Sequence, residues 1–149
     1  MCLCLVHQEF DPPLDERKAW KVFIRTSGGL RFPHYRMNGD YQPGEDVVEQ
    51  EVWLSAVQKM ARTIRGADYL TGFHAFTTVA SAFAWSKRPS AVVVPVKMRK
   101  VRLEGLHAQE RRHRDEPILK CWVADEMYVT KEIVNAQDPA YPAKSHLFP

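Results

Sequence analysis

Long hydrophobic runs are missing from this sequence. No stretch approaches the length of about 18 consecutive apolar residues that a transmembrane helix needs. The N-terminal segment MCLCLV is too short for a secretory signal peptide and lacks the basic flank of one. We therefore expect a cytoplasmic protein with no membrane partner.

Cysteine is also scarce. The three cysteines, Cys2, Cys4 and Cys121, form an odd and sparse set. Small secreted domains held by disulfides carry a denser and usually even set. The count excludes a disulfide scaffold and favours a reducing compartment, and we expect no metal site.

Neither sign of charge dominates, because the net charge is only +3. The positive charges are nevertheless concentrated in one part of the chain, where two glutamates, Glu104 and Glu110, oppose them. The cations of this stretch are Lys97, Arg99, Lys100, Arg102, Arg111, Arg112 and Arg114. Such a stretch is suited to phosphates or to an acidic protein surface. The alternative is a solvated strand and loop with no ligand.

The length of 149 residues is typical of a single domain. We expect an N-terminal arm over residues 1–18, where Asp11-Pro12-Pro13 disfavours helix. The folded domain should cover residues 19–134. Residues 135–149 contain three prolines and no periodicity, so we expect an extended C-terminal tail there.

Hydrophobic periodicity predicts a mixture of strands and helices. Alternating, β-branched and continuous apolar runs predict strands at 19–25, 30–32, 91–101, 118–124 and 127–129. The spacing of Trp53, Val57, Met60 and Ile64 predicts a helix over 52–64, and the alanine-rich segment 77–85 predicts a second. Residues 33–46, rich in turn signals, are expected to be irregular. The predicted fold class is α+β: a mainly antiparallel curved sheet with two or three helices.

The segment LTGFHAFTT, residues 70–78, is the most informative short motif. His74 can bind a phosphate, hydrogen-bond a ribose hydroxyl or move a proton. It also lies beside Gly72, which allows close approach of a ligand or another chain segment. The alternative is a buried histidine that hydrogen-bonds the backbone. Three tyrosines in turn-rich context, Tyr35, Tyr41 and Tyr69, are candidates to line a nearby pocket.

A family resemblance rests on the order of four motifs: WKVFIR, GFHAF before an alanine-rich helix, VVVPVK and VADEMYV. This order resembles small phage and prophage proteins, which in turn look like trimmed relatives of the ADP-ribosyltransferase fold. The resemblance implies that Arg25 or His74 contacts a dinucleotide such as NAD, and that Glu126 is the catalytic carboxylate. In the VADEMYV strand that carries the resemblance, the adjacent Asp125 and Glu126 stand in place of the Gln-x-Glu or Glu-x-Glu pair of that family.

Three functions remain open from the sequence. The first is a phage-type binding protein, such as an inhibitor of a host defence system in the host cytosol. It would capture a nucleotide-like ligand or an acidic host protein through His74, Arg25, Tyr69 and the cations Lys97, Arg99, Lys100 and Arg102. The second is an ADP-ribosyl-transferring or NAD-cleaving enzyme that uses Glu126. The third is sequence-independent binding of nucleic acid by residues 97–114.

Overall fold

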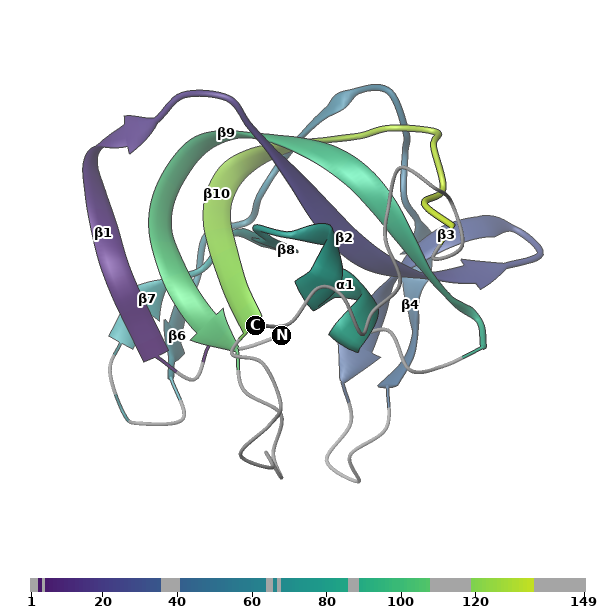
Figure 1. The fold of residues 1–149 in the computed structure, drawn as a ribbon, viewed down its shortest axis with the longest axis horizontal. Helices are drawn as coiled ribbons and strands as arrows, with labels where there is room; N and C mark the ends of the chain where they lie inside the picture. The colour runs from purple at the N-terminus through teal and green to yellow at the C-terminus, as the bar shows by residue number, and fades with distance from the viewer. Residues whose placement is uncertain are drawn as a thin grey trace.

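Antiparallel β-strands make up most of the fold (Figure 1). The computed structural model describes residues 3, 5–35, 41–63, 66, 68–85, 89–107 and 119–135. Within them the elements are β1 (Leu5–Leu14), β2 (Arg17–Thr26), β3 (Gly29–Tyr35), β4 (Tyr41–Val47), β5 (Trp53–Ser55), β6 (Met60–Arg62), β7 (Asp68–Leu70), β8 (Phe73–Phe76), α1 (Val79–Trp85), β9 (Ala91–His107) and β10 (Leu119–Val129). With one short helix among the described residues, the fold is mainly β, and the expectation of an α+β fold with two or three helices is wrong.

The helix expected over 52–64 accounts for much of this difference. That segment instead forms β5, which pairs with β10, and β6, which pairs with β7. The predicted apolar stripe is not a buried face, since Val57 is 76% exposed and Met60 is 67% exposed. Backbone groups of β10 at Glu126 to Tyr128 gain a hydrogen-bonded partner in β5. Tertiary pairing therefore overrides the helical spacing.

The long strand β9 organises the sheet (Figure 1). Its first half pairs with β2 and its second half with β1, while β10 runs antiparallel along its other side. The strand β8 then pairs with β10 and, through Trp20 and Phe76, with β2. The pairings therefore close into a ring in the order β2, β9, β10 and β8. The strands expected at 91–101, 118–124 and 127–129 are confirmed, with the last two joined into one.

Residues at the start of the chain belong to this sheet. Strand β1 lies along β9, with a register irregularity between Glu9 and Leu14 where Pro12 and Pro13 occur. Leu3 is fully buried in the core. Strand β9 therefore pairs with β1, which precedes residue 18, and with β2, which includes it. The sequence placed the end of an N-terminal arm at residue 18.

Two hydrophobic clusters occupy opposite faces of the curved sheet. One contains Phe83 of α1, packed with Val22, Phe76 and Val93, and Figure 1 shows α1 within the arc of β9 and β10. The other cluster contains Phe23, in the strand β2 that also supplies Val22. Alternation along β2 thus feeds both clusters, as the strand period of two requires. The helix expected at 77–85 is confirmed as α1.

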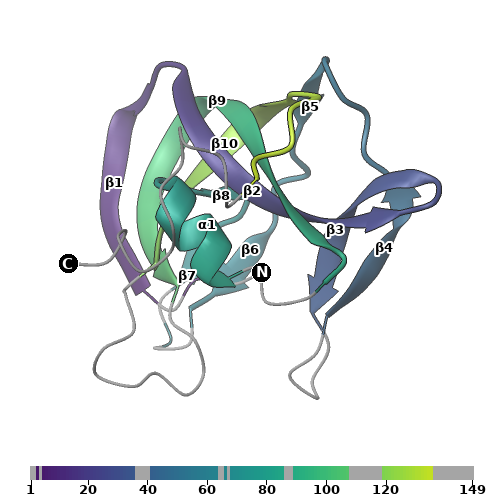
Figure 2. The ribbon, with the colours of Figure 1, turned by 45° about the vertical axis from the view of Figure 1, so that its right-hand side comes forward.

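The hairpin of β3 and β4 extends to one side of the ring (Figure 2). The predicted β2–β3 hairpin is confirmed, with Thr26 opposite Gly29. Residues 33–46 were expected to be irregular, but β3 continues to Tyr35 and pairs with β4. Pro33 lies opposite Pro43 in this ladder. None of the helices in the described part of the chain has the length and apolar character needed to cross a membrane.

Candidate ligand-binding pocket

A pocket of about 270 Å³ opens between β2, β3, β8 and α1. Its aromatic walls come from separate elements: Phe32 of β3, Phe73 and Phe76 of β8, and Trp85 of α1. Phe32 and Phe73 stack with ring centroids 6.2 Å apart, and Phe76 lies 6.0 Å from Trp85. The remaining lining residues are Lys21, Val22, Pro33, Val57, Gly72 and His74. The pocket is therefore apolar and aromatic apart from a few polar groups.

Lys21 supplies the positive charge of this pocket. It occupies the middle of β2, opposite Val94 of β9, and is only 8% exposed. Its Nζ donates a hydrogen bond to the carbonyl oxygen of His74 at 2.5 Å and lies 5.6 Å from the centre of the Phe32 ring. Burial lowers the pKa of Lys21 from the usual 10.5 to about 8, against an opposing effect of Cys121. Burial therefore makes the charge on Lys21 unfavourable, and it brings the pKa closer to neutral pH than that of an ordinary lysine.

Two of the three N–H donors of Lys21 have no acceptor among the residues that the structure describes. An ammonium group carries three donors, and the His74 carbonyl accepts one of them. Buried polar groups in proteins are normally satisfied, because an unpaired one costs free energy. Unused donors on a buried cation that lines a pocket therefore indicate a place for an anionic or carbonyl-bearing ligand.

The His74 ring belongs to a hydrogen-bond chain inside the core. Nδ1 lies 3.1 Å from the Gly72 carbonyl oxygen, which can only accept, so Nδ1 carries a proton. In the neutral ring Nε2 then accepts from the Tyr69 hydroxyl at 3.2 Å, and Tyr69 Oη accepts from the Leu3 N–H. His74 and Tyr69 are both buried, at 6% and 3% exposed. His74 contributes to the pocket chiefly by holding Lys21 through its carbonyl group.

The carboxylate of Glu126 is held by two of the predicted phosphate-binding cations. Arg99 Nη2 lies 3.0 Å from Glu126 Oε2, and Lys100 Nζ lies 3.4 Å from Oε1. The Arg99 guanidinium also stacks over Trp53, 3.6 Å from the ring centre. Glu126 is therefore part of a surface ion-pair cluster on β9 and β10, and neither it nor these cations line the pocket.

Arg102 connects three chain segments. Its Nε donates to Asp125 Oδ1 at 2.5 Å, and its Nη1 and Nη2 donate to the carbonyl oxygens of Leu70 and Thr71 at 3.0 and 2.8 Å. Gly72 is the next residue, and a Cβ there would clash with the carbonyl oxygen of Ala124. The guanidinium thus fixes the backbone that leads into β8 and the pocket, rather than facing a ligand.

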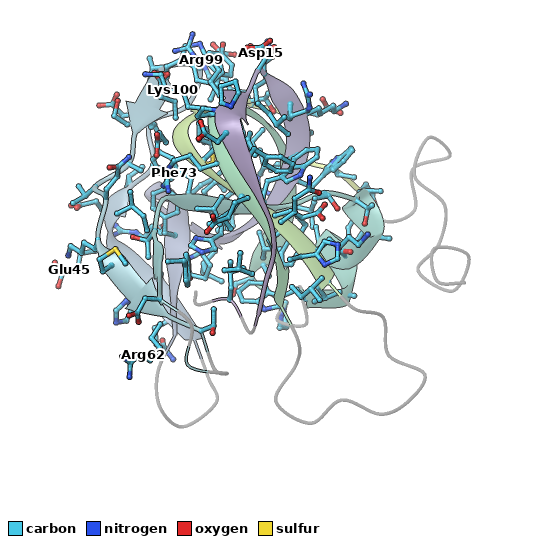
Figure 3. The ribbon with its side chains drawn as sticks, turned by 90° about the vertical axis from the view of Figure 1, so that its left-hand side faces the viewer. Asp15, Glu45, Arg62, Phe73, Arg99 and Lys100 are labelled. Carbon is cyan, nitrogen blue, oxygen red and sulfur yellow. The ribbon has the colours of Figure 1, made fainter. Side chains whose placement is uncertain are left out.

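The structure therefore separates the residues that the sequence grouped into one site. Figure 3 shows Arg99 and Lys100 at the top of the molecule with Phe73 below them, and neither cation lines the pocket to which Phe73 belongs. Lys97 is exposed and lies 5.2 Å from the centre of the Tyr128 ring, and Arg25 is exposed near the end of β2. The cations Arg111, Arg112 and Arg114 and the side chains of Tyr35 and Tyr41 lie outside the described residues, as does nearly all of the expected 135–149 tail.

Lys21 was not among the site residues predicted from the sequence, although the pattern of its strand indicates a buried position. Ala19, Lys21 and Phe23 alternate along β2, and both flanking residues are buried completely. A strand period of two places the lysine on that same inward face. A lysine in such a position is rare, because burying an unpaired ammonium is expensive.

Comparisons with known proteins add no further assignment. Neither the protein-family models nor the curated proteins nor the solved structures include a match to this chain.

Proposed function

We propose that this protein is a binding protein that captures a flat, anionic, nucleotide-like ligand in the pocket at Lys21. The observation that supports the proposal is the buried ammonium in that pocket, two of whose donors have no acceptor within the described part of the chain. A phosphate or other anion would accept those hydrogen bonds in a low-dielectric setting, where charge-assisted hydrogen bonds are strong. For a phage-type protein, such capture suits an inhibitor of a host defence system.

The aromatic walls favour a planar ligand. Phe32 and Phe73 already stack on each other, and Phe76 and Trp85 form a second pair. A base placed against such rings gains about 1–3 kcal/mol from stacking. The volume of about 270 Å³ is near the lower end of the range of ligand pockets, about 300–1,000 Å³. It therefore suits a mononucleotide better than a dinucleotide such as NAD.

The ion pairs weigh against the two other functions. An ADP-ribosyl-transferring enzyme would need Glu126 beside its ligand, whereas Arg99 and Lys100 hold that carboxylate outside the pocket. Nucleic-acid binding by β9 would need unpaired cations. Three of the four predicted cations of β9, Arg99, Lys100 and Arg102, have carboxylate partners.

The first experiment is thermal melting of the purified protein with AMP, ADP, NAD, ADP-ribose, cyclic dinucleotides and short RNA at two salt concentrations. A ligand at a hundred times its dissociation constant stabilises by about 2.7 kcal/mol. Since each kcal/mol moves Tm by roughly 2–4 °C, we expect a shift of about 5–10 °C with a mononucleotide. A shift with RNA alone that disappears at high salt would instead support the nucleic-acid function.

Calorimetric titration of Lys21→Met then tests the pocket. Loss of charge-assisted hydrogen bonds of about 1.5–3 kcal/mol should weaken nucleotide binding by about 10- to 100-fold. Lys18→Met is the matched control, because Lys18 is an exposed lysine on the same strand. Equal losses in both variants, or no ligand in the panel for the wild-type protein, would contradict the proposal.

A further inference from the structure

The pocket at Lys21 also contains a nucleophile. The ring of His74 has a hydrogen-bond partner at each nitrogen, and the aromatic lining residues carry no nucleophilic group. Lys21 ends in a primary amine, which attacks carbonyl carbon when it is unprotonated. Its Nζ is fixed by the hydrogen bond to the His74 carbonyl oxygen and by the rigid strands β2 and β9 on either side of its backbone. The nucleophile therefore has a defined position beside the aromatic walls.

The surroundings of Lys21 favour its neutral amine. Among the described residues, Cys121 of β10 acts on the charge of Lys21, and His74 of β8 lines the same pocket and contributes its backbone carbonyl oxygen. Helix α1 has the sequence VASAFAW and so carries no ionisable side chain, and β3 presents Phe32 and Pro33 to the pocket. No carboxylate among the described residues pairs with Lys21, so desolvation dominates and the pKa falls to about 8.

We propose that Lys21 is a covalent capture site for small aromatic aldehydes or ketones, which it binds as an imine. The amine lone pair attacks the carbonyl carbon, proton transfer from nitrogen to oxygen gives a carbinolamine, and loss of water forms the C=N bond. No oxidant or reductant is needed, and hydrolysis reverses the reaction. The aromatic ring of the ligand packs against Phe32, Phe73, Phe76 and Trp85. This chemistry goes beyond nucleotide capture and needs only that the pocket admit one ring.

Reductive trapping of the wild-type protein tests the inference. Benzaldehyde and sodium cyanoborohydride are added at pH 7, and benzylated lysines are quantified by peptide mapping over time. At this pH an amine of pKa about 8 is roughly one-tenth unprotonated, whereas an ordinary lysine of pKa about 10.4 is roughly one part in 2,500 unprotonated. Allowing for restricted access, we expect Lys21 to react at least about tenfold faster than the exposed lysines Lys18 and Lys59.

The pH dependence provides a second readout. With the exposed Lys18 and Lys59 as controls, the rate of benzylation at Lys21 should level off above about pH 8, where its amine is largely unprotonated. Reaction of Lys21 at the same rate as those controls, or only after unfolding in urea, would overturn the inference. The two proposals fail separately: nucleotide binding without benzylation of Lys21 removes the covalent chemistry alone, and benzylation without any nucleotide shift removes the proposed function alone. If both hold, AMP should slow the benzylation.

Discussion

Lys21 is the residue at which stability and function compete. A buried ammonium that has no carboxylate partner among the described residues destabilises the folded state, because desolvation is only partly offset by the hydrogen bond to the His74 carbonyl oxygen. Groups with strongly shifted pKa values are concentrated at functional sites. The cost at Lys21 is therefore evidence for a role of the pocket.

This cost predicts a pH dependence of stability. Lys21 has a pKa of about 8 in the folded chain and about 10.5 when unfolded, so the unfolded chain binds more protons between those values. The free energy of unfolding should therefore rise with pH across this window, by up to about 3 kcal/mol. Below about pH 8 the full cost is present, and above about pH 10.5 it is absent.

Urea unfolding at about pH 7, 9 and 10 measures the effect against Lys21→Met, which has no titrating group at position 21. We expect the difference in stability between the variant and the wild-type protein to shrink as the pH rises. A difference that stays constant from pH 7 to 10 would show that Lys21 is not desolvated.

At the scale of elements, Arg102 joins β9, β10 and the segment between β7 and β8. Its replacement by methionine removes the cation beside Asp125, which keeps the hydrogen bond from Gln58 Nε2, and takes the Arg102 donors away from the Leu70 and Thr71 carbonyl groups. We expect a loss of about 2–4 kcal/mol in urea unfolding, because a largely buried charged network is broken.

Arg62→Met is the matched control for this prediction. Arg62 also pairs with an aspartate, Asp68, but the side chains are 72% and 58% exposed. An exposed pair contributes little, so this variant should lose less than about 1 kcal/mol. Similar losses in the two variants would contradict the role assigned to Arg102.

Element prediction from the sequence succeeded where local pattern and tertiary environment agree. The alternation of β2 and the continuous apolar start of β9 are such cases, since both strands are buried at the positions that the pattern marks. The pattern failed over 52–64, where the apolar spacing fits a helix but Val57 and Met60 are exposed. In this segment β5 pairs with the distant strand β10, whereas β6 pairs with the neighbouring strand β7. The pairing with β10 is long-range, so it leaves no trace in a short window.

At the scale of the whole molecule, the first fourteen residues are expected to be part of the cooperative fold. Strand β1 covers the second half of β9, and Leu3 packs against Gly105, where a Cβ would clash with the Leu3 side chain. A chain that begins at Asp15 should therefore lose cooperative thermal unfolding, measured by circular dichroism. It would expose the edge of β9 and leave a cavity at Leu3.

A chain that begins at Leu3 is the control, because it keeps both β1 and the buried leucine. It should melt within a few degrees of the full chain. If the chain that begins at Asp15 melts as cooperatively as this control, the domain starts near residue 18, as the sequence suggested.

The sequence by itself determined the strand β2, the start of β3, much of β9 and β10, and the helix α1, because their periodicity or composition is a local property. It also marked His74 and the cations of β9 as residues of interest. Only the tertiary structure decided which of these meet. Ring closure joins β2 to β8 and so sets Lys21 beside the His74 carbonyl group, whereas the pairing of β9 with β10 turns Arg99, Lys100 and Arg102 toward carboxylates. Charge alone could not reveal this, since the partner of each cation is fixed by strand register.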